Sequence, residues 1–109
     1  MEWGLRNDGQ RLIAAPTGRV DEESWKDFST RLNAAVHEAA GASLPLVIDL
    51  SGLEYMTSKG LRALTMAKNE AKGAVAISLA APNFTMRRIL AISRYNMLFP
   101  VVDDVDQAT

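Results

Sequence analysis

Two neighbouring hydroxyl side chains, Thr57 and Ser58, stand where the sequence predicts the start of a helix. A hydroxyl oxygen at such a place can accept a hydrogen bond from the unpaired backbone N–H groups of the first turn. The same N–H groups and the positive end of the helix dipole favour an anion, so a phosphate on a hydroxyl would be tolerated there. Gly60 is expected to keep the backbone accessible in this turn. The residues alone therefore allow two interpretations, an ordinary helix cap, which is common, or a site for an anion.

Catalysis by the chain is not indicated by its residue types. A serine nucleophile needs an adjacent base, and neither a histidine nor a carboxylate lies close to Ser58 in the sequence. His37 is the only histidine and there is no cysteine, so a histidine pair, a thiolate site and a disulfide are excluded. Glycine-rich phosphate loops are absent. An enzyme built around Ser58 would need a base from a distant loop, so we predict that the chain is not an enzyme and uses no metal or cofactor.

The composition predicts one ordinary globular domain, residues 1–109, with 48% hydrophobic and 23% charged residues. Twelve basic and thirteen acidic residues give a net charge of −1, which argues against direct binding to nucleic acid or to an anionic membrane. The first residues do not open a signal peptide. The longest stretch without a charge, residues 73–86, is too short to span a bilayer. We therefore expect a cytoplasmic protein without membrane insertion.

Apolar runs and turn residues predict an alternation of strands and helices in the order ββαβαβαβ, with a possible closing helix. Expected strands are 2–7, 11–15, 46–50, 75–80 and 98–102. Expected helices are 21–41, 58–72, a third marked by Met86, Ile89, Leu90 and Ser93, and a short helical tail at 103–109. Asp8-Gly9 is a predicted hairpin turn, Pro16-Thr17-Gly18 is expected to end the second strand, and 51–56 is expected to be a loop. This order indicates an α/β fold with a mostly parallel mixed sheet of about five strands and helices packed on it.

Several side chains have predicted structural roles. Asp21 is a candidate N-cap of the first helix, whose inward face would carry Trp25, Phe28, Leu32, Ala35, Val36 and Ala39. The inward positions of the second helix would be Leu61, Leu64, Ala67 and Ala71. The cluster Asp103, Asp104 and Asp106 lacks the glycine and closing glutamate of a calcium loop, so we expect it to be solvated. Function in such folds tends to lie beyond the carboxyl ends of the strands, here in loops 18–21, 51–60 and 82–85.

The segment from Asp49 to Leu64 resembles the signature of the STAS family, the anti-sigma factor antagonists of bacterial partner switching. In that family a buried strand ending in D-L-S-G is followed by an apolar pair and then by D-S-S-G-L or S-S-A-G-L-R. This chain has D-L-S-G at 49–52, Tyr55-Met56, and T-S-K-G-L-R at 57–62. Gly18-Arg19-Val20-Asp21 is similar to the family's G-x-x-D, and residues 92–108 resemble its last strand. The resemblance therefore extends over nearly the whole chain and implies a single STAS domain.

The resemblance implies a phosphorylatable switch. The phosphorylated serine of the family falls on Ser58, with Thr57 as an alternative acceptor. The implied partners are a serine protein kinase that doubles as an anti-sigma factor, bound by the unphosphorylated form, and a serine phosphatase. Thr57, Ser58, Lys59, Gly60 and Arg62 would form the partner-binding surface, and the process served would be signal transduction and transcription regulation.

Two positions depart from the family pattern, and they keep a second function open. Thr57 stands where aspartate is frequent, and Lys59 stands where a second serine is frequent. Lys59 could pair with a phosphate on its neighbour, contact a partner, or be solvated. Threonine near this place also occurs in STAS subunits of lipid-type ABC transporters. The alternative function is therefore a structural or assembly role as the STAS subunit of a membrane transporter.

Overall fold

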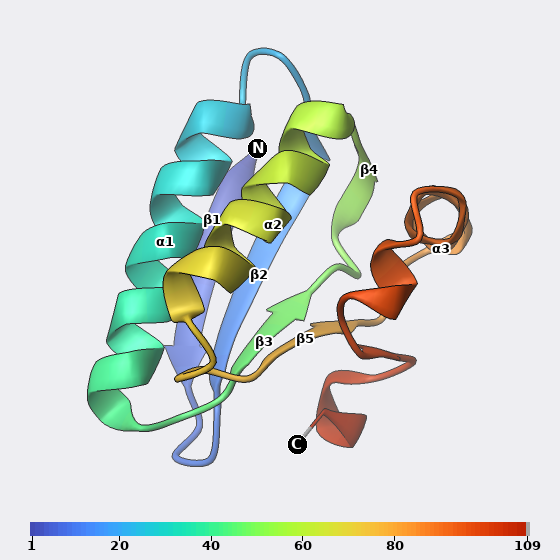
Figure 1. Ribbon diagram of the computed structural model, residues 1–109. Helices are drawn as coiled ribbons and strands as arrows, with labels where there is room; N and C mark the ends of the chain where they lie inside the picture. Colours follow the sequence, from blue (N-terminus) through green and yellow to red (C-terminus); the bar gives the residue numbers. More distant parts are fainter. Residues whose placement is uncertain (109) are drawn as a thin grey trace.

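A mixed β-sheet with two long helices on one face forms the body of the protein, in a computed structural model that describes residues 1–108 (Figure 1). The strands are β1 (Glu2–Asn7), β2 (Leu12–Val20), β3 (Leu46–Asp49), β4 (Leu53–Met56), β5 (Ile77–Ala80) and β6 (Val101–Val102). The helices are α1 (Trp25–Ala42), α2 (Ser58–Ala71) and α3 (Phe84–Ile92), and short 3-10 turns span Tyr95–Met97 and Val105–Gln107.

The strands are ordered β1-β2-β3-β5-β6, and β4 pairs with β2 beyond the end of β3. Among the strand pairs of residues 1–108, only the β1–β2 hairpin is antiparallel, and the other pairs are parallel. The predicted α/β class, the first hairpin and the three helices are thus confirmed. The sheet has six strands where about five were expected, and the last strand is shorter than predicted.

The second strand does not end at Pro16, as the sequence indicated, but continues to Val20. On one side, residues 12–17 of β2 pair with β1. On the other side, the start of β2 pairs with β3 and its end pairs with β4. The N–H groups of Leu12 and Gly18 both point to that second side, where they donate to the carbonyls of Pro45 and Gly52 respectively. Because alternate residues point the same way, Pro16 faces the gap between the two partner strands, where no N–H is needed.

Residues 53–56 form strand β4 and not the predicted loop. The burial pattern explains the error, because Leu53 and Met56 are buried while Glu54 and Tyr55 between them are exposed, which is not the alternation typical of a strand. The pairing with β2 passes through an irregularity at Gly18, whose φ of 89° is left-handed. This extra strand carries the chain directly to the start of α2.

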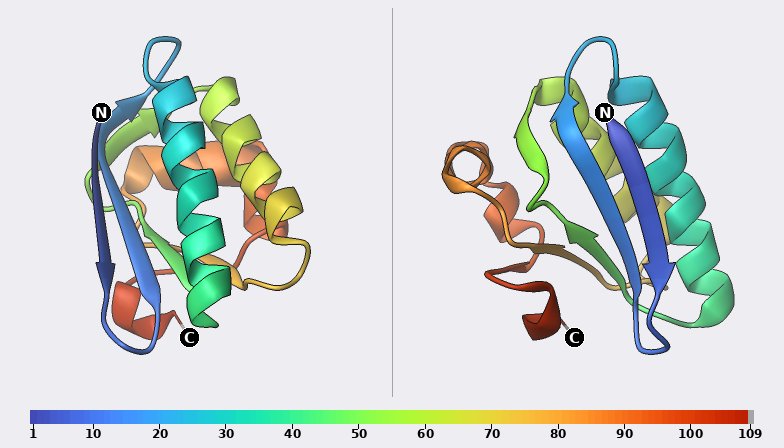
Figure 2. Two further views of the ribbon diagram at one scale, coloured as in Figure 1. Left: turned by 90° about the vertical axis from the view of Figure 1, so that its left-hand side faces the viewer. Right: turned by 180° about the vertical axis from the view of Figure 1, so that it is seen from behind.

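The main core lies between the sheet and the helices. The apolar face of α1 is buried as predicted at Phe28, Leu32, Ala35, Val36 and Ala39, whereas Trp25 is only partly buried. In α2, Leu64, Ala67 and Ala71 are buried, but Leu61 is partly exposed and Gly60 and Ala63 take inward positions. Helix α3 contributes Met86 and Leu90 to the same core. Figure 2 shows α1 and α2 side by side behind the sheet in its right-hand view.

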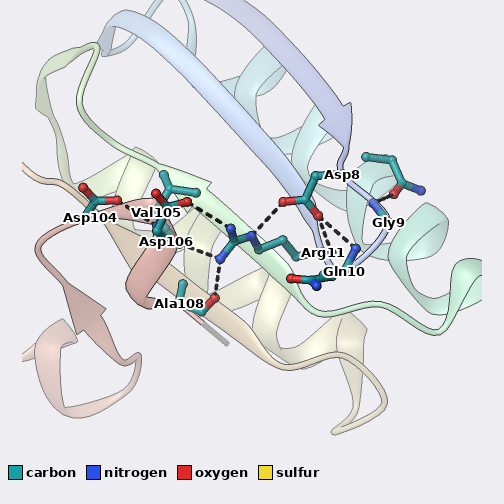
Figure 3. A network of polar contacts seen from close by, with 9 residues as sticks. Asp8, Gly9, Gln10, Arg11, Asp104, Val105, Asp106 and Ala108 are labelled. Carbon is teal, nitrogen blue, oxygen red and sulfur yellow. Dashed lines mark hydrogen bonds and ion pairs between the residues drawn. The ribbon is translucent and has the colours of Figure 1, made fainter.

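Part of the opposite face of the sheet is covered by the end of the chain, where the predicted helical tail is a short 3-10 turn at Val105–Gln107. Ala108 is buried against Ile13, Val47 and Ala80. Arg11 holds this segment in place: its Nη1 donates to the carbonyls of Val105 and Ala108 at 2.9 and 2.8 Å (Figure 3). The guanidinium also pairs with Asp8 and Asp106. The predicted solvation of the acidic side chains Asp103, Asp104 and Asp106 is confirmed, since all three are exposed. The attachment of their segment to the sheet was not predicted, because Arg11 lies about a hundred residues away from it along the chain.

Candidate functional site

The starts of α1 and α2 lie at the same end of the molecule because they follow two neighbouring parallel strands, β2 and β4 (Figure 1). The junction is closed by a hydrogen bond of 2.9 Å from the Thr57 N–H to the Val20 carbonyl. The segment before α1 and the Thr57–Arg62 segment are thereby brought together, although 36 residues separate Asp21 from Thr57. Two of the three loops in which the sequence analysis expected function, 18–21 and 51–60, therefore meet at this end of the molecule.

Gly60 allows α2 to approach the sheet closely. It is buried, and a methyl group added to it would lie 2.8 Å from Val20 Cγ1 and closer still to Met56 Cγ. The expectation that Gly60 keeps the backbone accessible is therefore wrong. Its role in this structure is to bring the first turn of α2 against β2 and β4, which fixes the position of the residues around it.

The two hydroxyl groups have different environments. Thr57 is the N-cap residue by its extended backbone, yet its side chain makes no cap hydrogen bond, and its Oγ1 is buried without a partner among the described residues. Ser58 is the first residue of α2 and is exposed. The predicted position of Ser58 at the accessible amino end of the second helix is confirmed. The serine hydroxyl is therefore the one that a second molecule can reach.

Lys59 connects the two helix starts. Its Nζ lies 2.8 Å from Glu22 Oε2 and 5.3 Å above the centre of the Trp25 ring. A second ammonium, that of Lys26, lies 5.8 Å from the same ring. Contacts of this kind between a cation and an aromatic face are attractive. Sequence reasoning missed Glu22 and Trp25 as neighbours of Ser58, and no local pattern could have found them, because only the pairing of β2 with β4 brings them there.

Asp21 organises the turn before α1 but is not its N-cap, since the helix begins at Trp25 after the cap residue Ser24. Partial burial raises the pKa of Asp21, but hydrogen bonds from the N–H groups of Glu23 and Ser24, with the Ser24 hydroxyl and the charge of Arg19, outweigh it. The net result is a pKa below the ordinary value of 3.8. The lowered pKa favours the charged carboxylate, which accepts the hydrogen bonds of the turn that carries Glu22.

Arg62 is exposed on the same first turns of α2, and it completes the accessible part of the predicted surface with Ser58 and Lys59. The third predicted loop is used differently. Asn83 caps α3 and its Nδ2 donates to the Leu53 carbonyl at the beginning of β4, away from Ser58. No group of three acidic or histidine side chains that could hold a metal occurs in residues 1–108. His37 is exposed and pairs with Glu70 of α2 at 2.8 Å.

Comparison with known proteins places the chain in a family. The family model described as "Mlab, STAS domain" matches residues 3–100. A STAS-domain containing protein of Pseudomonas aeruginosa is 35% identical over 95 residues, which cover 86% of this chain and 90% of that protein. The chain therefore belongs to the STAS domain family, as its sequence motifs indicated.

Solved structures of low identity share the fold. An anti-sigma factor antagonist from Mycobacterium paratuberculosis has a TM-score of 0.86 at 22% identity, covering 98% of this chain and 89% of that one. The antagonist SpoIIAA in its unphosphorylated form gives 0.74 at 17% identity, covering 92% and 87%. The phosphorylated form of SpoIIAA from Bacillus gives 0.66 at 18%, covering 92% and 90%. In residues 1–108, no helix is both long and apolar enough to cross a membrane.

Proposed function

We propose that this chain is a cytoplasmic antagonist in a partner switch, which binds a serine kinase of the anti-sigma factor type while Ser58 is unmodified and releases it once Ser58 carries a phosphate. The observation that carries the proposal is the exposed hydroxyl of Ser58 on the first residue of α2, at the position of the family's phosphorylated serine. SpoIIAA, which shares the fold, is described in both an unphosphorylated and a phosphorylated form.

The environment of Ser58 suits such a modification. In the transfer, the Ser58 oxygen would attack the terminal phosphorus of ATP, the bond to the leaving ADP would break, and the hydroxyl proton would pass to a base on the kinase. A serine phosphatase would reverse the modification by hydrolysis. The chain supplies only the acceptor hydroxyl, so the proposed function requires no turnover by the isolated protein. Burial of Thr57 Oγ1 favours Ser58 over Thr57 as the acceptor.

A phosphate should change binding and leave the fold intact. It adds about −1.5 to −2 charges, which takes the chain from −1 to about −3. The start of α2 tolerates an anion because of its N–H groups and the helix dipole. At an interface built on Ser58, Lys59 and Arg62, the same phosphate would be a hydrated charge that the partner surface has to desolvate, which is costly.

The test is binding to the cognate serine kinase by calorimetry, with thermal unfolding followed in parallel. We expect Ser58→Asp to weaken binding at least about tenfold, which corresponds to about 1.4 kcal/mol, with little change in melting temperature. Ser58→Ala should bind like the unaltered protein and should not be released by ATP. Ser58→Asn serves as the matched control, since it adds a side chain of similar size without a charge, and it should bind more tightly than Ser58→Asp. Equal affinity of Ser58→Asp and the unaltered protein would contradict the switch.

A second function is favoured by one observation. The resemblance also associates a threonine near this place with STAS subunits of lipid transporters. The hydroxyl of Thr57 is buried at the start of α2, so it is not accessible to a kinase there. As such a subunit the chain would have an assembly role, and Ser58→Asp would act only through lost docking on the transporter. The genes that flank this one separate the two functions: a serine kinase and phosphatase support the switch, and a permease with an ATPase supports the subunit.

A further inference from the structure

The ammonium group of Lys59, the residue after Ser58, already has an ion-pair partner in the unphosphorylated protein. Lys59 Nζ pairs with Glu22 Oε2 at 2.8 Å and lies 5.3 Å from the Trp25 ring centre. Both members of the ion pair are partly exposed, with 43% of the Lys59 side chain and 68% of the Glu22 side chain accessible. Ion pairs at such exposure are weak, because water and salt screen them. A stronger anion in reach of Lys59 can therefore displace Glu22.

A phosphate on Ser58 would be that anion. It carries up to about twice the charge of the Glu22 carboxylate and three strong acceptor oxygens. It would be attached to the residue immediately before Lys59. Successive side chains of a helix point about 100° apart, so the Lys59 ammonium has to leave the Trp25 ring in order to turn toward Ser58. The two positions of Lys59 are mutually exclusive for this reason.

We propose that Lys59 is a positioning residue exchanged between Glu22 and a phosphate on Ser58, an inference that rests on the proposed function. In the unmodified protein Lys59 covers Trp25 and neutralises Glu22. After phosphorylation it neutralises part of the phosphate charge, and it uncovers the Trp25 face and the Glu22 carboxylate. Phosphorylation at the start of α2 thereby also changes the surface at the start of α1. A partner that contacts both helix starts would encounter the phosphate on α2 and the uncovered Glu22 and Trp25 on α1.

Two measurements on protein with phosphoserine incorporated at position 58 test the exchange without any partner. The chain has two tryptophans, so a Trp3→Phe background leaves Trp25 as the only one and keeps an aromatic ring beside Phe28. We expect phosphorylation to change the Trp25 emission as Lys59→Met does in the unmodified protein, and to have no further effect in Lys59→Met. Titration by phosphorus NMR should show the second phosphate pKa, near 6, about half a pH unit higher in Lys59→Met, because the cation that favours the dianion is gone.

Lys26→Met is the matched control, since Lys26 Nζ lies 5.8 Å from the same ring. It should alter the Trp25 emission and leave the phosphate titration unchanged. The exchange is overturned if Lys59→Met leaves the phosphate pKa where it was, or if Trp25 responds equally to phosphorylation with and without Lys59. Either result leaves the switch itself standing, because that depends on the affinity of the Ser58 variants for the kinase.

Discussion

Helices α2 and α3 begin from nearly the same backbone conformation and differ in what their first residues do. The cap residues Thr57 (φ −84°, ψ 177°) and Asn83 (φ −71°, ψ 178°) are both extended. Asn83 Oδ1 accepts from the Met86 N–H at 2.8 Å, and its Nδ2 donates to the Leu53 carbonyl at 2.9 Å. Thr57 makes no side-chain cap. The start of α3 is thus closed by its own side chain, whereas the start of α2 is left without one.

The next residues extend the contrast. The first helical residue is Ser58 in α2 and Phe84 in α3, both exposed, and the third is Gly60 in α2 and Met86 in α3, both buried. The start of α3 is therefore held by the Met86 side chain, which is buried in the core. The start of α2 is held by close packing of its backbone, which Gly60 permits because it has no side chain. The backbone N–H groups at the start of α2 are therefore not taken up by a cap side chain, in contrast with those at the start of α3.

Adding a methyl group at Gly60, where α2 packs closely on β2 and β4, should have the largest effect on stability. In Gly60→Ala the new methyl group meets Val20 and Met56, which are both buried, so we expect a loss of about 2–3 kcal/mol in the free energy of unfolding, measured in urea. Gly41→Ala in α1 is the control, because nothing lies within 4 Å of an added Cβ there. It should gain up to about 1 kcal/mol from helix propensity. Equal responses of the two glycines would refute the packing role.

Removing the side-chain cap of α3 should have the next largest effect on stability. Asn83→Ala removes the acceptor for the Met86 N–H and the donor to Leu53, and we expect it to cost about 1–2 kcal/mol. Asn83→Asp keeps the acceptor and loses the donor, so its cost should be smaller. Thermal unfolding of the three proteins separates the two contacts. No loss of stability in Asn83→Ala would mean that α3 is held by Met86 and Leu90 alone.

The smallest effect, and one of opposite sign, is expected at the cap of α2. Thr57→Val replaces a buried hydroxyl without a partner by a methyl group of similar shape, so we expect a gain of about 1 kcal/mol in urea unfolding. Thr57→Ala, which also removes volume, should not show the gain. A loss of about 1 kcal/mol in Thr57→Val would instead reveal a working threonine cap and would make the two helix starts alike.

Local sequence patterns predicted those parts of the fold that depend on local physics. The helical spacing of apolar residues located the buried face of α1, and the apolar run before Asp49 located the central strand β3. The predicted strand end at Pro16 and the predicted loop at 51–56 were wrong because both conformations depend on distant partners. Pro16 is tolerated within β2 because it faces the gap between β3 and β4, and β4 forms through its pairing with the end of β2. The covering of the second face of the sheet by the end of the chain depends in the same way on Arg11.

The sequence by itself determined the α/β class, the family, and the position of Ser58 at the start of a helix, because periodicity, turn residues and a continuous motif are all local. Only the tertiary structure decided which residues surround that serine. Parallel pairing of β2 with β4 brings Glu22 and Trp25 to Lys59, and the packing of the fold buries the Thr57 hydroxyl while it leaves Ser58 accessible. These neighbours come from segments remote in the chain, and their meeting is set by strand pairing and packing, which no local spacing encodes.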